Sequence, residues 1–309
     1  MKQNTPSKQT SLAQLCALEI LDGIQHFLTA KRAENVSIKT LKLYKYHLTR
    51  FADFAQARNI SLIENINSLL VSEYISSLKG IWKPGTRHIA FRAIRTFTYW
   101  YEDFTDGEYH SPCHKLRAPK LPKNKKPTVD LETFRQLLSG CEGKTRHRDK
   151  ALLMFAFDSA MRMNEIRELN IKDVNLMSGR IEILHGKGDK YGVTYISSPT
   201  LKALRAYLKT RRKISESDPL FTTFFEQRIS VNGLTSILSR IQKRAGIDVH
   251  GFHAFRRGFG TEFIRNGGDL STLQKIYRHA DVSTTVTYLG LTDDDIQHAH
   301  NASAPILRL

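Results

Sequence analysis

Residues 115–127 read KLRAPKLPKNKKP, and this stretch decides how the chain is divided. It contains prolines at positions 119, 122 and 127, and each proline restricts its own backbone and that of the residue before it. It also carries six lysine or arginine residues and no acidic residue. We therefore expect an extended basic linker over residues 113–127, with a folded domain on either side.

The charge of the whole chain is strongly positive. The chain has 309 residues, which favours two domains, and its 47 Lys and Arg against 30 Asp and Glu give a net charge of +17. Such an excess favours a polyanionic partner, because neutralising phosphates releases condensed counterions. A nucleic acid is expected, although charge alone leaves open an unrelated basic enzyme or an anionic membrane surface. On DNA, the linker residues Lys123, Lys125 and Lys126 are candidates to lie along the backbone.

Cysteine usage and hydropathy bear on the compartment. Cys16, Cys113 and Cys141 are far apart, odd in number and without CxxC spacing. This pattern argues against a disulfide framework and against a zinc site. It indicates a protein of the reducing cytoplasm. The polar N-terminus lacks the apolar core of a signal peptide, and no apolar run is long enough to span a membrane. We expect a soluble cytoplasmic protein with no membrane partner and no cofactor.

The N-terminal part, residues 12–112, is predicted to be helical. Its most informative helix covers residues 86–101, where two faces can be told apart by their spacing. The predicted apolar face contains Ile89, Ala93, Phe97 and Trp100. Another face contains a cationic set with a tyrosine beside it: His88, Arg92, Arg95 and Tyr99. This second face could be merely solvated, but the basic context favours DNA contacts through His88, Arg92 and Arg95.

The C-terminal part, residues 128–309, has a mixed pattern. Two short strands, 180–185 and 191–197, flank a Gly-Lys-Gly-Asp-Lys turn and predict a β-hairpin. The remaining apolar patterns predict helices, over residues 128–141, 148–169, 201–213, 233–245, 255–266 and 271–277. The expected fold class is therefore mainly α with a small β-hairpin, an α+β domain after a helical one.

Four segments of the C-terminal part resemble those of a known family. They are SAMRMNEIREL (159–169), HGKGDKYGVTYIS (185–197), HAFRRGFGTEFI (253–264) and YRHADVSTTVTY (277–288). In this order they resemble the phage-integrase, or Xer-like, family of tyrosine recombinases. Each motif alone is weak, whereas four in the family's order are specific. The resemblance is looser over the N-terminal helical domain.

The first two motifs supply two of the family's catalytic groups by resemblance. Arg162 matches the first catalytic arginine and is expected on a helix, with Glu165 one turn later to orient it through an ion pair. On spacing alone this pair could equally be a surface salt bridge. Lys187 matches the hairpin lysine that acts as the general acid for the leaving 5′-hydroxyl. By itself it would be an ordinary exposed turn lysine.

The last two motifs supply the other groups. His253 and Arg256 match the His-x-x-Arg box, in which the arginine clamps the phosphate and the histidine hydrogen-bonds it or accepts the tyrosine proton. His279 matches the next position and would donate to a non-bridging oxygen. Tyr288, nine residues later, matches the nucleophile. A phenol has a pKa of about 10, so flanking cations must stabilise the phenolate as it develops.

Three positions depart from the family pattern. Ala160 stands where glycine is frequent, Arg278 replaces the glycine before His279, and Arg257 replaces a histidine after Arg256. None removes a catalytic group, and the two arginines are expected to add positive charge beside the site. After Tyr288, LTDDDIQHAH predicts a short helix with Thr292 as its cap. It could fold back on its own domain or, by resemblance, dock on a neighbouring protomer.

The resemblance implies a two-domain C-shaped clamp around double-stranded DNA. Residues 12–112 would form the core-binding domain and residues 128–309 the catalytic domain, joined by the linker 113–127. Tyr288 would form a 3′-phosphotyrosine and release a 5′-hydroxyl, with neither ATP nor metal. Strands would be exchanged through a Holliday junction by a homotetramer on two recombination sites. A type IB topoisomerase, a DNA-binding regulator without activity and a metal-dependent nuclease are the alternatives.

Overall fold

The protein divides into two compact units, residues 1–124 and 125–309. The structure is a computed structural model, and it describes residues 18–122, 127–183, 191–279, 281–286, 289, 291–295, 297 and 300. Each unit has its own apolar core. Over the described residues, the helices are too short or too polar for any of them to cross a membrane.

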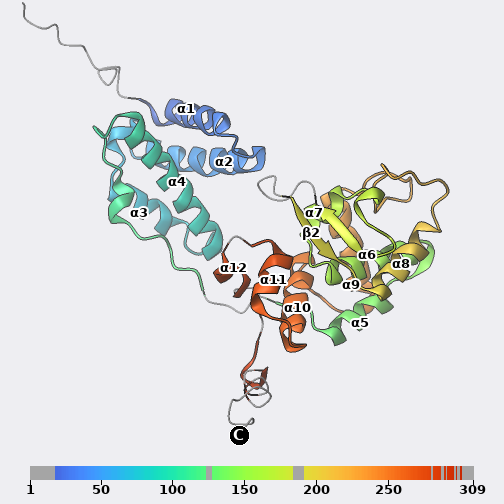
Figure 1. Ribbon diagram of the computed structural model, residues 1–309. Coiled ribbons are helices and arrows are strands. Elements are labelled where there is room, and N and C mark those ends of the chain that lie inside the picture. The colour runs from blue at the N-terminus through green and yellow to red at the C-terminus, as the bar shows by residue number, and fades with distance from the viewer. Residues whose placement is uncertain are drawn as a thin grey trace, which may run out of the picture. The chain divides into compact units, whose positions relative to one another are not determined.

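The first unit is a bundle of helices (blue to blue-green in Figure 1). Helix α1 packs against α2 and α4, and α3 packs against α4. Rings of phenylalanine fill the centre, where Phe27, Phe51 and Phe97 have no exposed surface. The elements are α1 (Ile20–Ala33), α2 (Ile38–Gln56), η2 (Ile63–Asn65), α3 (Ser68–Ser77), α4 (Pro84–Phe104) and η3 (Pro112–Lys115).

The buried face of α4 differs from the predicted one by about one residue. Ile89, expected in the core, is 39% exposed, whereas Tyr101 is only 3% exposed. The buried residues Ala90, Ile94, Phe97 and Tyr101 recur at the spacing of one helix face. Of the predicted face, Ala93 and Phe97 are buried and Trp100 packs on the core, so Ile89 is the residue that was placed wrongly.

The linker begins later along the chain than predicted. Residues 112–115 form the 3-10 helix η3, and Cys113 is 1% exposed in the core of the first unit. Leu116 and Ala118 pack on the same core. Residues 116–122 and 127–130 have no helix or strand, as the prolines predict. Lys123, Lys125 and Lys126 lie outside the described residues.

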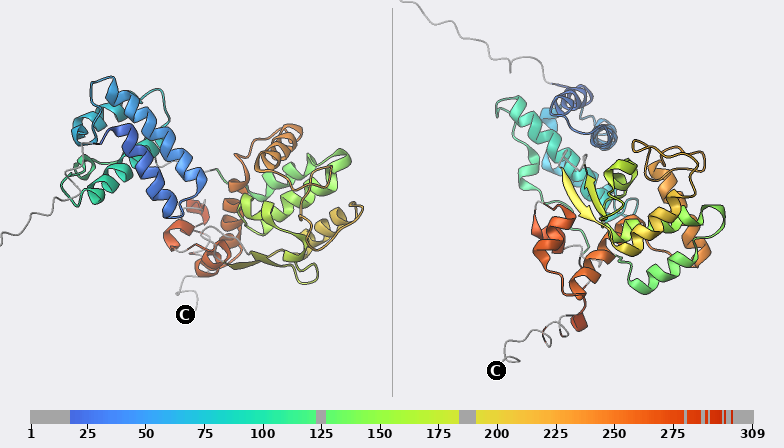
Figure 2. Two further views of the ribbon diagram at one scale, coloured as in Figure 1. Left: turned by 90° about the horizontal axis from the view of Figure 1, so that it is seen from above. Right: turned by 45° about the vertical axis from the view of Figure 1, so that its right-hand side comes forward.

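The second unit is mainly helical with one small sheet (Figures 1 and 2). The sheet pairs β1 (Arg180–Ile183) with β2 (Gly192–Tyr195) antiparallel, with Ile183 opposite Gly192, which confirms the predicted pairing of two short strands; the turn between them lies outside the described residues. The helices are α5 (Leu131–Ser139), η4 (Gly143–Thr145), α6 (Arg146–Asp158), α7 (Met163–Glu168), η5 (Ile171–Asp173), α8 (Ser198–Leu208), α9 (Val231–Ala245), α10 (Phe252–Arg265), α11 (Leu270–Tyr277) and α12 (Val282–Val286).

The single helix predicted over residues 148–169 is two helices. Helix α6 ends at Asp158, and α7 begins at Met163. Between them Ala160 has a φ of +52°, a left-handed conformation that a continuing helix cannot contain. Apolar periodicity alone could not reveal this break, because Ala160 and Met161 are both buried as helix residues would be. The break changes how Arg162 is presented.

Helix α6 lies at the centre of this unit, packed against α8 and α10. Two glycines of α10 allow close approach of other segments. A Cβ on Gly258 would lie 2.0 Å from the carbonyl oxygen of Val129, and one on Gly260 would lie 2.1 Å from the Tyr277 hydroxyl. Helix α10 is thereby held against both the start of the unit and α11, which brings residues 253–256 near residues 277–279.

Candidate active site

Arg162 stands at the N-terminal end of α7, rather than within a helix as predicted. Its backbone is extended, with φ −73° and ψ 146°, so it is the N-cap residue. The Glu165 side chain reaches back to it twice: Oε2 accepts from the Arg162 backbone N–H at 2.9 Å, and Oε1 accepts from Nη1 at 2.9 Å. The predicted ion pair is therefore present. It also caps the helix, and the Arg162 side chain stays 26% exposed.

Arg278 is a second cation on the same carboxylate. Its Nη2 donates to Glu165 Oε2 at 2.5 Å, and the Arg278 side chain is only 13% exposed. Arg278 therefore lies beside the site as expected, and its positive charge is paired with Glu165. Its backbone has a φ of +53° at the C-terminal end of α11, a conformation for which glycine is the usual residue.

These cations keep Glu165 ionised although it is buried. Burial alone would raise the pKa of this carboxyl, but Arg278 and the hydrogen bonds from Arg162 outweigh that effect. The pKa of Glu165 is consequently below its ordinary value. The carboxylate can then accept from both arginines near neutral pH.

Arg256 is almost completely buried on α10, with 1% exposure. Its Nη1 donates to the Ala160 carbonyl at 2.5 Å, and its Nη2 donates to the Tyr277 carbonyl at 2.6 Å. The guanidinium lies over the Tyr277 ring at 4.3 Å, and the Tyr277 hydroxyl donates back to the Arg256 carbonyl. Burial and the nearby Arg162 lower the pKa of Arg256 to about 10, so it remains charged at neutral pH.

His279 meets Arg256 edge to edge. Its Nε2 lies 3.2 Å from Arg256 Nη2, and its Nδ1 lies 2.9 Å from the hydroxyl of the buried Thr285. Gln274 fixes the backbone at this point by donating to the His279 carbonyl at 3.0 Å. Burial, and then Arg256, Arg162 and Arg278, lower the pKa of His279 to about 4.

The electrostatics of this cluster favour an anion. Arg162, Arg256 and Arg278 are all close enough to depress the pKa of His279, and Glu165 is the carboxylate that offsets them. Three guanidiniums against one carboxylate leave a local excess of positive charge. Guanidinium binds phosphate oxygens well, because its donors form a planar fork.

The structure brings some of the predicted catalytic residues together and leaves others undescribed. Arg162, Arg256, His279 and the supporting Glu165 form the cluster. His253 is the second residue of α10 and its side chain is exposed, one turn before Arg256. Lys187 and Tyr288 lie outside the described residues, so their roles stay predictions.

Several residues of the cluster were missed or given another role. The Tyr277 carbonyl binds Arg256, and the Thr285 hydroxyl binds His279. Both residues lie inside the motif 277–288, but the sequence did not predict a role for either. Arg257, expected to add charge at the site, donates through Nε to the Pro127 carbonyl at 2.6 Å and ties α10 to the start of the unit. The spacing of residues around Arg257 could not predict this contact, because Pro127 is 130 positions away in sequence.

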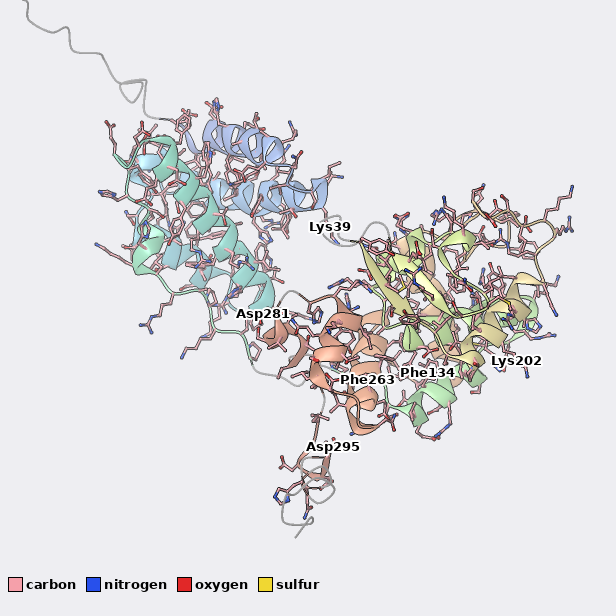
Figure 3. All side chains as sticks on the ribbon, viewed as in Figure 1. Lys39, Phe134, Lys202, Phe263, Asp281 and Asp295 are labelled. Carbon is pink, nitrogen blue, oxygen red and sulfur yellow. The ribbon has the colours of Figure 1, made fainter. Side chains whose placement is uncertain are left out.

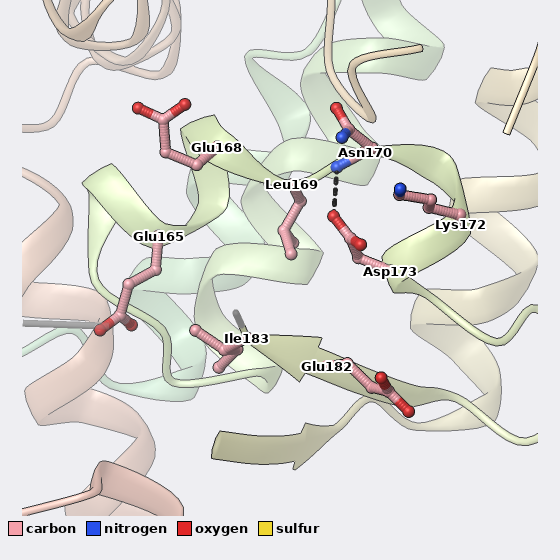
Figure 4. Close-up of a pocket in the computed structure, with 8 residues that line it drawn as sticks. All are labelled: Glu165, Glu168, Leu169, Asn170, Lys172, Asp173, Glu182 and Ile183. Carbon is pink, nitrogen blue, oxygen red and sulfur yellow. Dashed lines mark hydrogen bonds between the residues drawn. The ribbon is translucent and has the colours of Figure 1, made fainter. Parts of the chain in front are cut away.

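Glu165 also lines a pocket of about 200 Å³. Figure 4 shows Glu165 on α7 and Glu182 on β1 at this pocket, and Asp173 accepting from the Asn170 backbone N–H. Acidic side chains predominate among its lining residues. Within the described ranges no three His, Cys, Asp or Glu side chains are grouped as metal ligands would be.

The sequence profile of the phage integrase family matches residues 128–294, more than half of the chain. The chain belongs to the phage integrase family. The family predicted from the four motifs is thereby confirmed, and with it the predicted class of enzyme, a tyrosine site-specific recombinase.

Curated relatives match over nearly their whole length. The tyrosine recombinase XerD of Listeria innocua is 27% identical over 289 residues, which cover 89% of this chain and 94% of the relative. The tyrosine recombinase XerA of Thermococcus kodakarensis is 25% identical, over 93% of this chain and 96% of the relative. The similarity therefore extends beyond the catalytic motifs into the N-terminal helical unit.

Solved structures share the fold at lower identity. The XerH site-specific recombinase in a post-cleavage complex with a palindromic difH substrate gives a TM-score of 0.71 at 23% identity, over 90% of this chain and 83% of that one. The Tn1549 transposon integrase in complex with transposon right end DNA gives 0.74 at 15% identity, over 92% and 99%. The predicted fold class, mainly α with a small sheet, is confirmed.

In this member of the phage integrase family, the three cations predicted on α4 have different environments. Arg92 is exposed, whereas Arg95 is half-buried. The ring of His88 is 2.9 Å from the Pro119 carbonyl through Nδ1, so it contacts the chain leaving the first unit. Arg92 is thus the one of the three whose side chain is open to solvent.

The segment after Tyr288 begins as predicted. The Thr292 hydroxyl accepts from the Asp295 backbone N–H at 3.3 Å, and Asp295 Oδ2 accepts from the Thr292 backbone N–H at 2.7 Å. Asp295, labelled in Figure 3, also binds Arg265 of α10 through both carboxylate oxygens, at 2.8 and 3.0 Å. The start of this tail is therefore tied to its own unit.

Proposed function

We propose that the cluster of Arg162, Arg256 and His279 binds the scissile phosphate of duplex DNA. The observation that carries this proposal is a group of three guanidiniums with a single carboxylate: Arg162 and Arg278 bind Glu165, and Arg256 lies 3.2 Å from the His279 ring. A phosphate would complete the charge balance. Arg162, with its part-exposed side chain, and the buried Arg256 would hold the non-bridging oxygens as charge develops.

Tyr288 is the proposed nucleophile. Its phenol oxygen attacks phosphorus, the bond from phosphorus to the 5′-oxygen breaks, and a 3′-phosphotyrosine forms. The phenolic proton passes to His253 or to solvent, and Lys187 gives a proton to the leaving 5′-oxygen. Attack by a 5′-hydroxyl of another strand reverses these steps and rejoins the DNA. One phosphodiester is exchanged for another, so the bond energy is kept.

DNA is the proposed partner of both units. The net charge of +17 and the exposed Arg92 of α4 support this, as does the basic linker between the units. We propose that residues 12–112 bind the duplex beside the cleavage site, residues 128–309 cut it, and the two close around it as a clamp. Two protomers on each of two sites would exchange strands through a Holliday junction.

A nicked suicide substrate tests the cleavage step. The recognition site is first located by footprinting on DNA that flanks the gene. The purified full chain is then incubated with a radiolabelled duplex nicked next to the expected cut, and denaturing electrophoresis detects a covalent adduct. We expect an adduct with this duplex, unchanged by EDTA, and none with Tyr288→Phe.

Tyr195→Phe is the matched control, because Tyr195 is an exposed tyrosine of the same unit. It should form the adduct at the wild-type rate. An adduct that persists in Tyr288→Phe, or no adduct from the wild-type chain on its footprinted site, contradicts the proposed chemistry. Sedimentation of the complex with two-site DNA tests the tetramer separately.

A further inference from the structure

We propose that Arg278 is a positioning residue for DNA cleavage, which holds the Glu165 carboxylate so that Arg162 is presented to the phosphate. This inference rests on the proposed function of the cluster. Arg278 stands one residue before His279, and it touches neither the reacting atoms nor the phosphate in this proposal. It acts through Glu165, across the contact between α11 and α7.

Both oxygens of the Glu165 carboxylate accept hydrogen bonds, from donors on two elements. Oε1 takes the Arg162 Nη1, while Oε2 takes both the Arg162 backbone N–H and the Arg278 Nη2. With both oxygens engaged, the carboxylate cannot turn without losing a bond, and the Arg162 side chain is held in one direction. Without Arg278, Oε2 would keep only the backbone N–H as its donor, and burial would raise the pKa of Glu165 against the pairing with Arg162 that remains.

The backbone of Arg278 indicates that the side chain is required. Its φ of +53° is the left-handed conformation, which costs a non-glycine residue about 1–2 kcal/mol and costs glycine almost nothing. An arginine at such a position must gain from its side-chain contacts what it loses in backbone strain. The largely buried ion pair with Glu165 is a contact that can offset this strain.

Arg278 also couples the β-hairpin to the cluster. A Cβ added to Gly192 on β2 would lie 2.2 Å from Arg278 Cδ, so the aliphatic part of Arg278 rests directly on this glycine. Gly192 pairs with Ile183 immediately beside residues 184–190, which contain Lys187. The same side chain therefore contacts the hairpin and orients Arg162.

Other charged groups also face Glu165. Besides Arg162 and Arg278, Arg256 of α10 interacts with it electrostatically, and the pocket beyond it is lined by charges from α7, η5 and β1: Glu168, Lys172, Asp173 and Glu182. The removal of Arg278 leaves Arg162 and Arg256 near the carboxylate, with three further acids beyond it. We therefore expect the pKa of Glu165 to rise in that variant. On acidification its carboxylate should then become protonated at a higher pH than in the wild type.

Single-turnover cleavage of the suicide substrate tests the inference in four variants. Arg278→Gly accepts the left-handed backbone without strain, and we expect cleavage about tenfold slower, with the acidic limb of its pH profile moved to higher pH. Gly192→Ala displaces the Arg278 side chain and should act in the same direction. The double variant should be no slower than Arg278→Gly alone. Arg135→Ala, which breaks an exposed ion pair on α5, should cleave as the wild type does.

Two outcomes overturn the inference. One is wild-type cleavage by Arg278→Gly across the pH range, and the other is a Gly192→Ala effect that is equally large when Arg278 is already absent. Thermal unfolding without DNA distinguishes a failure of the Arg278 inference from a failure of the proposed DNA cleavage, because it requires no cleavage. If Arg278 holds ionised Glu165, the stability deficit of Arg278→Gly is largest at neutral pH and shrinks on acidification. A deficit that does not change with pH contradicts the inference even if no DNA is ever cut.

Discussion

The guanidinium of Arg256 and the imidazole of His279 meet at 3.2 Å, through Nη2 and Nε2. Arginine can only donate, so Nε2 must accept and the ring proton must be on Nδ1, which donates to Thr285. His279 is thus neutral in the free protein, with the nitrogen nearest the cations held unprotonated. A negative phosphate beside Arg256 would raise the pKa of His279, so that the ring could donate at the moment when charge develops.

The first prediction concerns the pH dependence of stability. His279 has a pKa of about 4 when folded, against 6.5 when unfolded. Between these values the unfolded chain binds the extra proton, so stability rises with pH across this window and falls on acidification. We expect His279 to account for a loss of about 1 kcal/mol between pH 7 and pH 5, less than the full pKa difference implies, because solvent screens the part-exposed ring. Urea denaturation of the wild type and of His279→Gln at both pH values measures it.

In His279→Gln this part of the pH dependence should be missing, while the contributions of other groups remain. Nitrogen NMR of the ring gives an independent reading. A signal that titrates at 6.5 or above in the free protein would contradict the arrangement of Arg256, His279 and Thr285.

The second prediction concerns Arg256 itself. Arg256→Lys keeps a positive charge but cannot donate to both the Ala160 and Tyr277 carbonyls, and one buried acceptor is left without its bond. We expect a loss of about 2–4 kcal/mol in the free energy of unfolding and a fall in cleavage of more than about 100-fold. Arg135→Lys, with a side chain 69% exposed, should change stability by less than about 0.5 kcal/mol. Equal effects of the two substitutions would show that Arg256 has no structural function.

The parts of the site that were predictable are those with a local signal. The strand pattern around Gly-Lys-Gly-Asp-Lys predicted the pairing of β1 with β2, and the spacing of Arg162 and Glu165 predicted their ion pair. Both depend on residues a few positions apart, so periodicity and motif order suffice to find them.

The parts that were missed depend on contacts between distant segments. Arg278 meets Glu165 across 113 positions of sequence, and Arg257 meets Pro127 across 130. Spacing cannot predict such pairs. The helix break at Ala160 was missed because a left-handed alanine has no signature in sequence, although glycine at that position in the family was a hint. Both family glycines that this chain replaces, at Ala160 and Arg278, stand at positive φ.

The third prediction follows from the break at Ala160. Ala160→Gly relieves the left-handed backbone but loses a buried methyl group, and the two effects, each about 1 kcal/mol, should nearly cancel. Ala160→Val adds a β-branched side chain at positive φ in a site with no exposed surface, and we expect a loss of more than about 3 kcal/mol. Thermal unfolding of both variants measures the contrast. If valine is tolerated as well as glycine, the backbone at this position is not left-handed.

The last prediction separates the cations of α4 by the salt dependence of DNA binding. Arg92 is exposed, so Arg92→Ala should weaken binding and reduce the slope of log K against log salt concentration by about 0.9, the loss of one phosphate contact. His88 instead contacts the Pro119 carbonyl, so His88→Ala should leave this slope unchanged and alter how the linker leaves the first unit. Fluorescence anisotropy with a labelled duplex at several salt concentrations measures both slopes. An unchanged slope in Arg92→Ala would remove Arg92 from the DNA interface, and a reduced slope in His88→Ala would show that its ring leaves Pro119 for a phosphate.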